Sequence, residues 1–389
     1  MDNNATTPLH PEVAKEMAAS LELYGNPSSM HSFGRETRVK VEEARERVAD
    51  FLDADTASVI FTGGGSESNN TALKLVTCTD STCVRCPATR KKIVTSVIEH
   101  PSVLNTVQKL ESRGVPAKYI SVDAEGKVDL NQLEAEVTDE CALVSIMMAN
   151  NEVGTIQDIK KIAEIAHRHG ALVHTDAVQA VGKLPLSVRD LDVDFLSFSA
   201  HKLYGPKGVG VLYAREGAPF CTFIHGGHQE EGRRAGTLNT LGIIGLGKAV
   251  EIASREMSER ELRVRNLKNR LKEGISSSIP DIHINGHPID NLAGTLNVSF
   301  RGAEGESILL YMDLEGIAVS TGSACASGSL DPSHVLLATG IDAVLAHGSI
   351  RFSLGGFNTE ADVDYVVEKL PGIIEKIRKM STMYSKSGE

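Results

Sequence analysis

The chain has 389 residues and a formal net charge of −11, from 51 acidic and 40 basic side chains. A chain of this length is too long to fold around one small core, so we expect a large domain and a smaller one. The negative net charge argues against nucleic-acid binding as the main function. No apolar run approaches the roughly 20 residues of a membrane span. The N-terminus lacks the basic segment followed by an apolar one that is typical of a signal peptide, so we expect a cytoplasmic protein.

The first predicted elements are a helix over residues 11–23 and a strand over residues 59–62 that runs into glycines. The turn Gly63-Gly64-Gly65-Ser66-Glu67 is followed by helical sequence. A glycine-rich turn at a helix N-terminus presents free N–H groups to a phosphate. The turn lacks the Lys-Ser/Thr of a nucleotide P-loop and the full spacing of a dinucleotide fingerprint, so taken alone it is weak evidence for a phosphate site.

Three cysteines, Cys78, Cys83 and Cys86, follow this region. A fourth nearby ligand is missing, and closed structural zinc sites need four. A disulfide is not expected in a reducing compartment. A plain loop and a metal site both remain open here, and we predict no metal.

Two apolar strands further along each end in a side chain capable of chemistry. Residues 93–98 lead into Glu99-His100-Pro101, where the His100 ring could stack on a planar cofactor, although a histidine at a strand end is often structural. Residues 171–176 end in Asp176, and such ends face the ligand crevice of an open α/β sheet. An aspartate there either caps a helix or holds a proton on the pyridine nitrogen of pyridoxal 5'-phosphate (PLP).

The next strand, residues 194–199, ends in Ala200-His201-Lys202 before a glycine-rich turn. A lysine at this position either extends to solvent or loses its proton, because an unpaired buried ammonium is costly. A deprotonated amine is what imine chemistry needs. The strand end therefore suggests that Lys202 is a Schiff-base lysine.

Strand and helix alternate from residue 59 to about residue 213, which predicts a mostly parallel sheet. A charged helix from residue 249 to about 279 is expected to link the domains, and residues 363–380 repeat an amphipathic pattern. Between them, small residues surround Cys325. An exposed loop cysteine is more often incidental than catalytic, yet mobility suits a nucleophile that must carry sulfur away.

With these segments in order, the chain resembles the NifS-type cysteine desulfurases, PLP enzymes of the class V aminotransferase group, from Asp2 to about Leu370. The segments that carry the resemblance are residues 2–8, 25–31, 99–101, 149–154, 174–179, 199–202, 232–237, 323–325 and 349–353.

The resemblance implies an α/β PLP-dependent transferase fold, with a large domain around a mostly parallel seven-stranded sheet and a smaller α+β domain. It places the large domain at residues 13–255 and the small domain, with the mobile cysteine loop, at residues 1–12 and 256–389. A homodimer is expected. The chain begins without the few strand residues that usually precede the first motif, so edge pairing of the N-terminus is left open.

The resemblance also implies roles for individual residues. The catalytic set is Lys202, Cys325, His100 and Asp176. The cofactor-binding set is Gly65, Ser66, His100, Asn151, Asp176, Gln179, Ser199, His201, Lys202 and Thr237, the last reaching the phosphate from a second subunit. Asn151 and Arg351 would bind the substrate, and Arg351 would make a bidentate contact with the substrate carboxylate.

The implied activity converts L-cysteine to L-alanine, leaves a persulfide on Cys325 and passes the sulfur to an acceptor protein such as an iron-sulfur scaffold. Three alternatives stay open: a selenocysteine lyase or other PLP-dependent lyase or aminotransferase, a non-enzymatic sulfur or iron-sulfur carrier, and a nucleotide enzyme built on the glycine-rich turn. The missing Lys-Ser/Thr and acidic ribose partner argue against the last. The sequence does not identify the acceptor.

Overall fold

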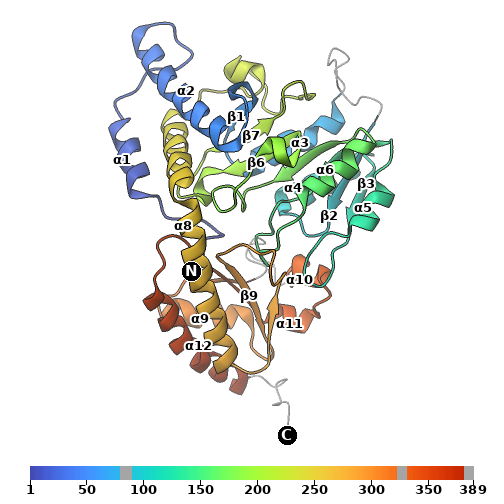
Figure 1. Cartoon of the computed structure of the whole chain (residues 1–389), viewed down its shortest axis with the longest axis vertical. Helices are drawn as coiled ribbons and strands as arrows, with labels where there is room; N and C mark the ends of the chain where they lie inside the picture. Colours follow the sequence, from blue (N-terminus) through green and yellow to red (C-terminus); the bar gives the residue numbers. More distant parts are fainter. Residues whose placement is uncertain (79–89, 322–330, 381–389) are drawn as a thin grey trace.

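Two β-sheets organise the chain in the computed structural model, which describes residues 1–78, 90–321 and 331–380 (Figure 1). The strands are β1 (Val59–Thr62), β2 (Lys92–Ser96), β3 (Ala117–Ile120), β4 (Cys141–Ser145), β5 (Leu172–Asp176), β6 (Phe195–Ser199), β7 (Gly210–Ala214), β8 (Ile282–Asn285), β9 (Thr295–Phe300), β10 (Ser320–Thr321) and β11 (Ser349–Ser353). The helices are α1 (Pro11–Ala19), α2 (Ser32–Leu52), α3 (Gly65–Lys74), α4 (Pro101–Glu111), α5 (Leu130–Glu136), α6 (Ile159–Arg168), α7 (Val188–Leu191), α8 (Thr240–Ser278), α9 (Gly305–Leu314), α10 (His334–Ala338), α11 (Ala343–His347) and α12 (Glu360–Met380).

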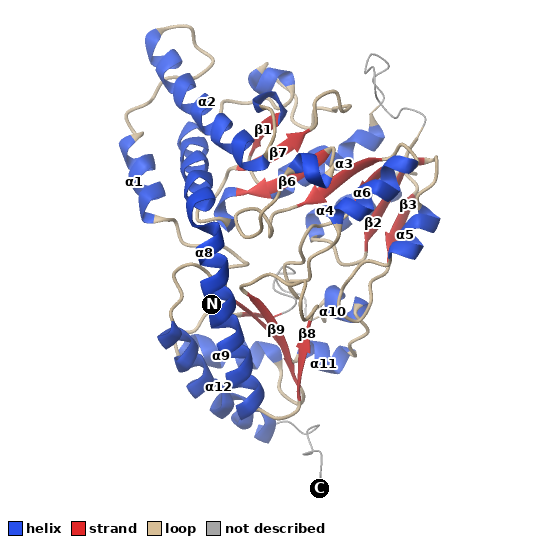
Figure 2. Ribbon diagram, viewed as in Figure 1, coloured by secondary structure: helices blue, strands red, loops and turns tan. Residues whose placement is uncertain are grey.

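The larger sheet has seven strands in the order β1-β7-β6-β5-β4-β2-β3, with helices alongside it (Figure 2). Strand β7 is antiparallel to both of its neighbours, and the remaining pairs are parallel. Strands β4, β5 and β6 are buried along nearly their whole length, as parallel strands covered on both faces should be. The predicted mostly parallel seven-stranded sheet is confirmed.

Local sequence explains where the helices begin. The side chain of Asp158 caps α6, and the apolar residues of α6 return at helical spacing to bury one face. Helix α8 begins at Thr240, nine residues before the predicted start at residue 249, because Asn239 supplies an N-cap by accepting from the Gly242 N–H. The first two turns are rich in glycine, whose low helix propensity does not predict a helix there.

Helix α8 has 39 residues and joins two hydrophobic cores. Its first part, up to Ala253, packs in the core around the larger sheet, and its last part, from Val264, packs in the core around the smaller sheet. Residues 254–263, all described, include no buried side chain. The helix is continuous across residues 255 and 256, where we predict the domain boundary.

The smaller sheet has four antiparallel strands in the order β10-β11-β9-β8, with α9 and α12 packed together beside it. The N-terminal residues return to this sheet: Asp2 forms a parallel bridge with Ser353, and the Ser353 N–H donates to the carbonyl of Met1 at 2.8 Å. The start of the chain therefore pairs with β11, which answers the question left open by the sequence.

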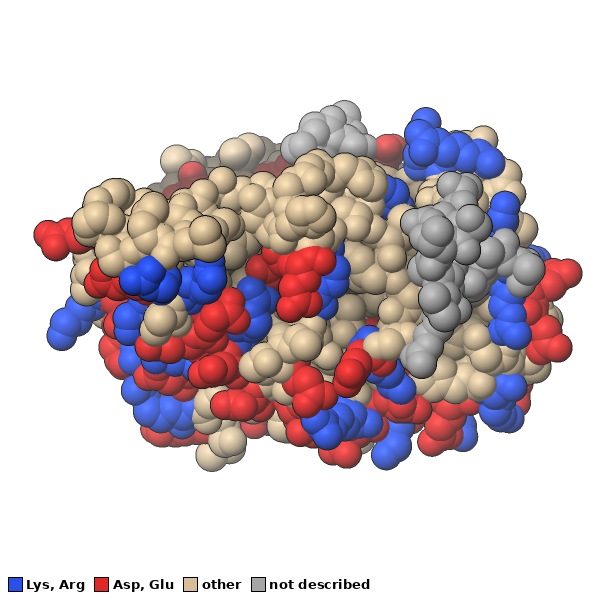
Figure 3. All heavy atoms as spheres, turned by 90° about the horizontal axis from the view of Figure 1, so that it is seen from above, with Lys and Arg blue, Asp and Glu red and all other residues tan. Residues whose placement is uncertain are grey.

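In Figure 3, charged side chains gather mainly in the lower part of the view, where acidic and basic ones are interspersed. Among the described residues, no helix is both long enough and apolar enough to cross a membrane.

Candidate active site

The carboxyl ends of β1, β2, β5 and β6 meet at one edge of the larger sheet and open into a cavity of about 420 Å³. Pockets for small molecules of cofactor size occupy about 300–1,000 Å³. The cavity is lined by Asp2, Asn4, Ala5, Gly65, Ser66, Asn69, His100, Ser102, Met147, Asn151, Asp176, Val178, Gln179, Ser199, His201, Lys202, Ser320 and Arg351. These come from both sheets and from the N-terminal segment, so the cavity lies between the two cores.

The structure brings ten predicted site residues together in this cavity: Gly65, Ser66, His100, Asn151, Asp176, Gln179, Ser199, His201, Lys202 and Arg351. Thr237 is exposed and is not part of the cavity wall. Cys325 lies outside the described residues, as do Cys83 and Cys86.

Lys202 ends a short 3-10 turn, Ala200–Lys202, that continues from β6. Its Nζ donates to the carbonyl oxygens of Asn4 and Ala5, at 2.6 Å for Ala5. Beside it, burial and then the Lys202 charge lower the pKa of His201 to about 4, so this imidazole is neutral at physiological pH.

A chain of hydrogen bonds connects Asp176 to His100. Asn69 Nδ2 donates to Asp176 Oδ2 at 2.7 Å and to Ser102 Oγ at 2.9 Å, and Ser102 Oγ lies 2.8 Å from His100 Nδ1. The N–H of Ser102 also donates to His100 Nδ1, which places the proton of the neutral ring on Nε2. Burial lowers the pKa of His100, while the charge of Asp176 raises it.

The first turn of α3 suits an anion. Its N-cap is Gly64, which has no side chain to satisfy the free N–H groups at this helix end. A Cβ added at Gly65 would lie 2.6 Å from a methyl carbon of Val178, so the turn can approach the cavity only with glycine there. Ser66, Ser199 and His201 line the same region. This set of donors fits a phosphate.

Arg351 reaches the cavity from β11 of the smaller sheet and is 2% exposed. Its Nη1 donates to the Asn151 carbonyl at 2.9 Å, and its Nη2 lies 3.0 Å from Asp2 Oδ1. Its Nε is buried and has no hydrogen-bond partner. Because a buried donor without a partner is costly, this arginine is suited to take a further acceptor.

Gln179 is held between the N-terminal segment and a buried lysine. Its Nε2 donates to the Asn4 carbonyl at 2.9 Å, and its Oε1 accepts from Lys183 Nζ at 2.7 Å. Burial, with the charges of Lys202 and Arg351, lowers the pKa of Lys183 to about 7. Lys183 does not line the cavity itself, but Lys202 and Arg351 do, so two cationic groups face this space, as a site for anionic groups requires.

Two buried carboxyl groups, Glu99 and Glu152, are sequence neighbours of residues that line the cavity. Burial raises the pKa of Glu99, which directly precedes His100, to about 8, even though Glu99 Oε1 accepts hydrogen bonds from Ser96 Oγ and the Met147 N–H. Burial likewise raises the pKa of Glu152 to about 7. Both groups therefore hold their protons well above the usual range of a carboxyl.

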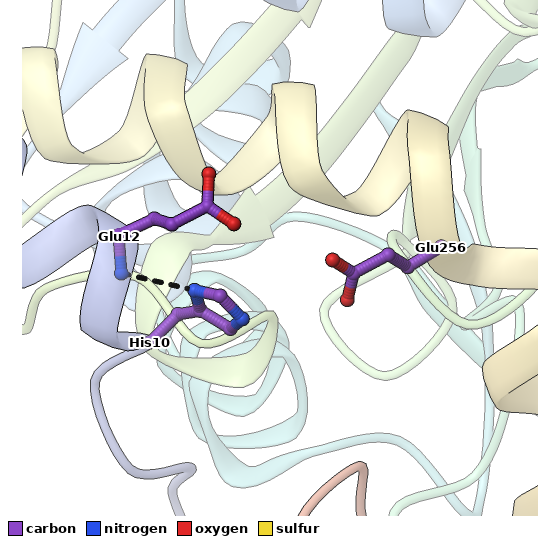
Figure 4. Close-up of side chains that lie close together, drawn as sticks. All are labelled: His10, Glu12 and Glu256. Atoms are coloured by element: carbon purple, nitrogen blue, oxygen red, sulfur yellow. Dashed lines mark hydrogen bonds between the residues drawn. The ribbon is translucent and has the colours of Figure 1, made fainter.

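His10, Glu12 and Glu256 form a separate group of potential metal ligands (Figure 4). None of the three lines the cavity. The Glu12 N–H donates to His10 Nδ1, and Arg255 Nη2 lies 2.6 Å from Glu12 and 2.7 Å from Glu256. Arginine thus already occupies the space between the two carboxylates. We interpret the group as a charge network that joins α1 to α8.

Sequence reasoning assigned no role to Asn69, Ser102 or Asp2. Asn69 lies one helical turn after Gly65, on the same face of α3, which is a usable signal. Asp2 belongs to a segment that was identified without a function, and its contact with Arg351 spans 349 positions. No local pattern reports such a contact.

Comparison with known proteins gives the following matches. The family model described as aminotransferase class-V matches residues 1–366. A cysteine desulfurase IscS from Clostridium botulinum (strain Hall) is 49% identical over 391 residues, covering 99% of this chain and 96% of the relative. A solved NifS-like protein superposes with a TM-score of 0.89 at 42% identity, covering 96% of this chain and 98% of that one. The solved structure of SspA in complex with cysteine gives a TM-score of 0.78 at 34% identity, covering 92% and 99%.

Proposed function

The chain belongs to the aminotransferase class-V family, and we propose that it is a PLP-dependent cysteine desulfurase that converts L-cysteine to L-alanine and receives the sulfur on Cys325. One observation carries the proposal: Lys202, Asp176 and Arg351 converge on a single cavity, in a chain about half identical to cysteine desulfurases. The SspA structure with bound cysteine supports the choice of substrate.

Members of this family depend on PLP, and the residues around the cavity fit it. The α3 N-terminus with Ser66, Ser199 and His201 would hold the phosphate, and Asp176 would pair with the ring nitrogen. When bound, PLP supplies an electron-withdrawing ring that stabilises negative charge at the substrate Cα.

The side chains around the ring would each control a proton. Asp176 would keep the ring nitrogen protonated, because its negative charge stabilises the N–H. Asn69 donates to the Asp176 carboxylate at 2.7 Å and so holds it in position. Lys202, once its amine is free, is the base that takes the Cα proton. His100, neutral and with its proton on Nε2, would face the ring and relay protons.

Arg351 would bind the substrate carboxylate, because its planar guanidinium matches a carboxylate with two parallel hydrogen bonds. Asn151 and Gln179 would lie beside the substrate and the cofactor oxygen. Gln179 is fixed by Lys183, so its amide presents a defined face.

Cys325 would complete the reaction as a thiolate. It attacks the substrate sulfur, so a sulfur–sulfur bond forms as the carbon–sulfur bond breaks, and the electron pair stays with the carbon, which takes up a proton. The balance is L-cysteine plus enzyme thiol giving L-alanine plus enzyme persulfide. A thiol has a pKa of about 8.5 unless its surroundings lower it, so the thiolate must be favoured locally.

The proposal extends to the partners. We propose a homodimer in which Thr237, exposed in one chain, reaches the phosphate site of the other. We further propose that the persulfide passes to an acceptor protein such as an iron-sulfur scaffold, and that the enzyme works in the cytoplasm.

The test is a visible spectrum of the purified protein before and after L-cysteine, with alanine measured in the same sample. We expect a cofactor band that responds to L-cysteine, and one sulfur atom added to the Cys325 peptide and removed by thiol reductant. Lys202→Ala should form no alanine and no borohydride-reducible link to PLP.

Cys325→Ser is the matched variant for the sulfur step. It should keep the spectral response to L-cysteine but form no alanine, since serine at neutral pH is no soft nucleophile. Alanine at the wild-type rate from this variant, or the added sulfur on the peptide with Cys78, Cys83 and Cys86, would contradict the proposal.

A further inference from the structure

The side-chain carboxylate of Asp2, near the N-terminus, contacts Arg351. The proposed function assigns the substrate carboxylate to this same arginine. The Arg351 Nη2 to Asp2 Oδ1 distance is 3.0 Å. Both side chains line the same cavity, together with Ser320. Asp2 therefore stands where a carboxylate ligand is expected to bind.

The donors of Arg351 show why the two carboxylates meet. A guanidinium offers two edges for a bidentate contact, one formed by Nε and Nη2 and the other by Nη1 and Nη2. Both edges include Nη2, the nitrogen that holds Asp2, whereas Nη1 donates to the Asn151 carbonyl. Any bidentate contact with a substrate must therefore include Nη2, which brings the substrate carboxylate next to the Asp2 carboxylate.

The two partners differ in their freedom to move. The Arg351 side chain is 3% exposed and the Asp2 side chain is 24% exposed. Asp2 is steadied by Ser320, whose Oγ donates to the same Oδ1 at 2.8 Å. Arg351 is fixed and Asp2 is the partner that can leave.

The surrounding charges favour a counter-ion on Arg351. Lys202 lines the same cavity as Arg351, and a buried guanidinium without a carboxylate is costly. Glu152 is the other nearby carboxyl, but its burial favours the protonated form, and it accepts from Ser333 Oγ. Among the described residues, Asp2 is the carboxylate that forms an ion pair with Arg351.

We propose that Asp2 is an exchangeable counter-ion for Arg351: it pairs with the arginine before the amino-acid substrate binds and is displaced by the carboxylate of that substrate. Asp2 thereby sets the affinity for that carboxylate. Two carboxylates on one nitrogen repel each other, so occupancy by one weakens the other. This inference rests on the proposed function, since it takes Arg351 as the substrate-binding arginine.

The experiment is an equilibrium titration of the PLP-loaded protein with L-alanine, followed by the absorbance of the bound cofactor. Ethylamine, which is L-alanine without its carboxylate, is the matched ligand. Asp2→Asn keeps the size of the side chain and an acceptor for Ser320 but removes the charge. We expect it to bind L-alanine about tenfold more tightly, a factor equivalent to about 1.4 kcal/mol, with ethylamine binding unchanged.

Ser320→Ala is the second variant, and it tests the same idea without altering Asp2. It loosens the hold on the carboxylate, so L-alanine should bind more tightly, by less than in Asp2→Asn. Unchanged or weaker L-alanine binding in Asp2→Asn overturns the inference, as does an equal gain for ethylamine. If Asp2→Asn does not fold, unchanged or weaker binding in Ser320→Ala overturns it. A wild-type protein whose absorbance does not respond to L-alanine would instead count against the proposed function.

Discussion

Asn69 links Asp176, which is expected at the ring nitrogen of the cofactor, to His100, which is expected to face the ring. Its Nδ2 donates to Asp176 and to Ser102, which contacts His100. Asn69→Ala removes a hydrogen bond to a carboxylate, an interaction of about 1.5–3 kcal/mol. We expect kcat/KM for L-cysteine to fall by about 10- to 100-fold.

The control for Asn69 is Thr71→Ala on the same helix, whose hydroxyl donates to the Glu67 carbonyl within α3. It should keep kcat/KM within about twofold of the wild type. If Asn69→Ala did the same, the hydrogen-bond chain from Asp176 to His100 would have no part in turnover.

Glu99 makes the stability of the fold depend on pH. Its pKa rises from 4.5 to about 8 in the folded protein because the carboxyl is fully buried. The folded state therefore keeps a proton that the unfolded chain releases above about pH 4.5. The stabilising contribution of this group is complete below pH 4.5 and is lost as pH rises toward 8.

Glu99→Gln should remove this dependence, since the amide cannot ionise and its oxygen can still accept from Ser96 and Met147. The slope that it removes is at most about 1.4 kcal/mol per pH unit. Urea unfolding at pH 5 to 8 measures it, with the exposed Glu140→Gln as the control. Parallel stability curves for Glu99→Gln and the wild type would show that Glu99 is ionised in the folded protein.

At the scale of elements, two helical glycines predict opposite effects of the same substitution. In α8, a Cβ at Gly247 would lie 2.7 Å from the Cβ of Ala44 in α2, so Gly247→Ala should destabilise the protein by about 1–3 kcal/mol through overpacking. In α12, a Cβ at Gly372 would meet nothing within 4 Å. Gly372→Ala should therefore stabilise it by about 0.5–1 kcal/mol.

Chemical unfolding of both variants measures the difference, and each is the control for the other. Equal effects of the two substitutions would mean that the contact between α2 and α8 does not constrain Gly247.

The elements also show how far sequence reasoning extends. The strand ends at Asp176 and Lys202 could be predicted because short apolar runs and the residues that follow them are local patterns. The start of α8 was missed, since Gly242, Gly245 and Gly247 have low helix propensity and tertiary packing overrides it.

The candidate site divides along the same line. A phosphate site at Gly65 and Ser66 could be predicted from the glycine-rich turn after a strand, whereas Ser199 and His201 were predicted only through the family resemblance. The pairing of Asp2 with Arg351 depends on how the N-terminus returns to β11. That return is a property of the assembled fold, and no segment encodes it alone.

At the scale of the whole molecule, α8 holds the two parts of the cavity wall in place. Asp176 ends β5 and Lys202 follows β6 of the larger sheet, whereas Arg351 lies on β11 of the smaller one. Ser258 is exposed in the middle of the helix. Ser258→Pro would remove a backbone hydrogen bond there and destabilise the helix by about 3 kcal/mol or more.

We expect Ser258→Pro to raise KM for L-cysteine while keeping the borohydride-reducible link at Lys202, and to split thermal unfolding into two transitions. Ser258→Ala, which keeps the helix intact, should behave like the wild type. A single transition and an unchanged KM in Ser258→Pro would show that the two cores are held together without α8.

The uninterrupted course of α8 also limits how its length can vary. Each residue of an α-helix adds a rotation of about 100° and a rise of about 1.5 Å, so one inserted or deleted residue between Ala253 and Val264 would turn the smaller core by about 100° about the helix axis. Seven residues, close to two full turns, restore the angle to within about 20° but separate the cores by about 10 Å. No insertion or deletion restores both the angle and the separation. The number of residues between Ala253 and Val264 must therefore stay the same if the two cores are to keep their relative position.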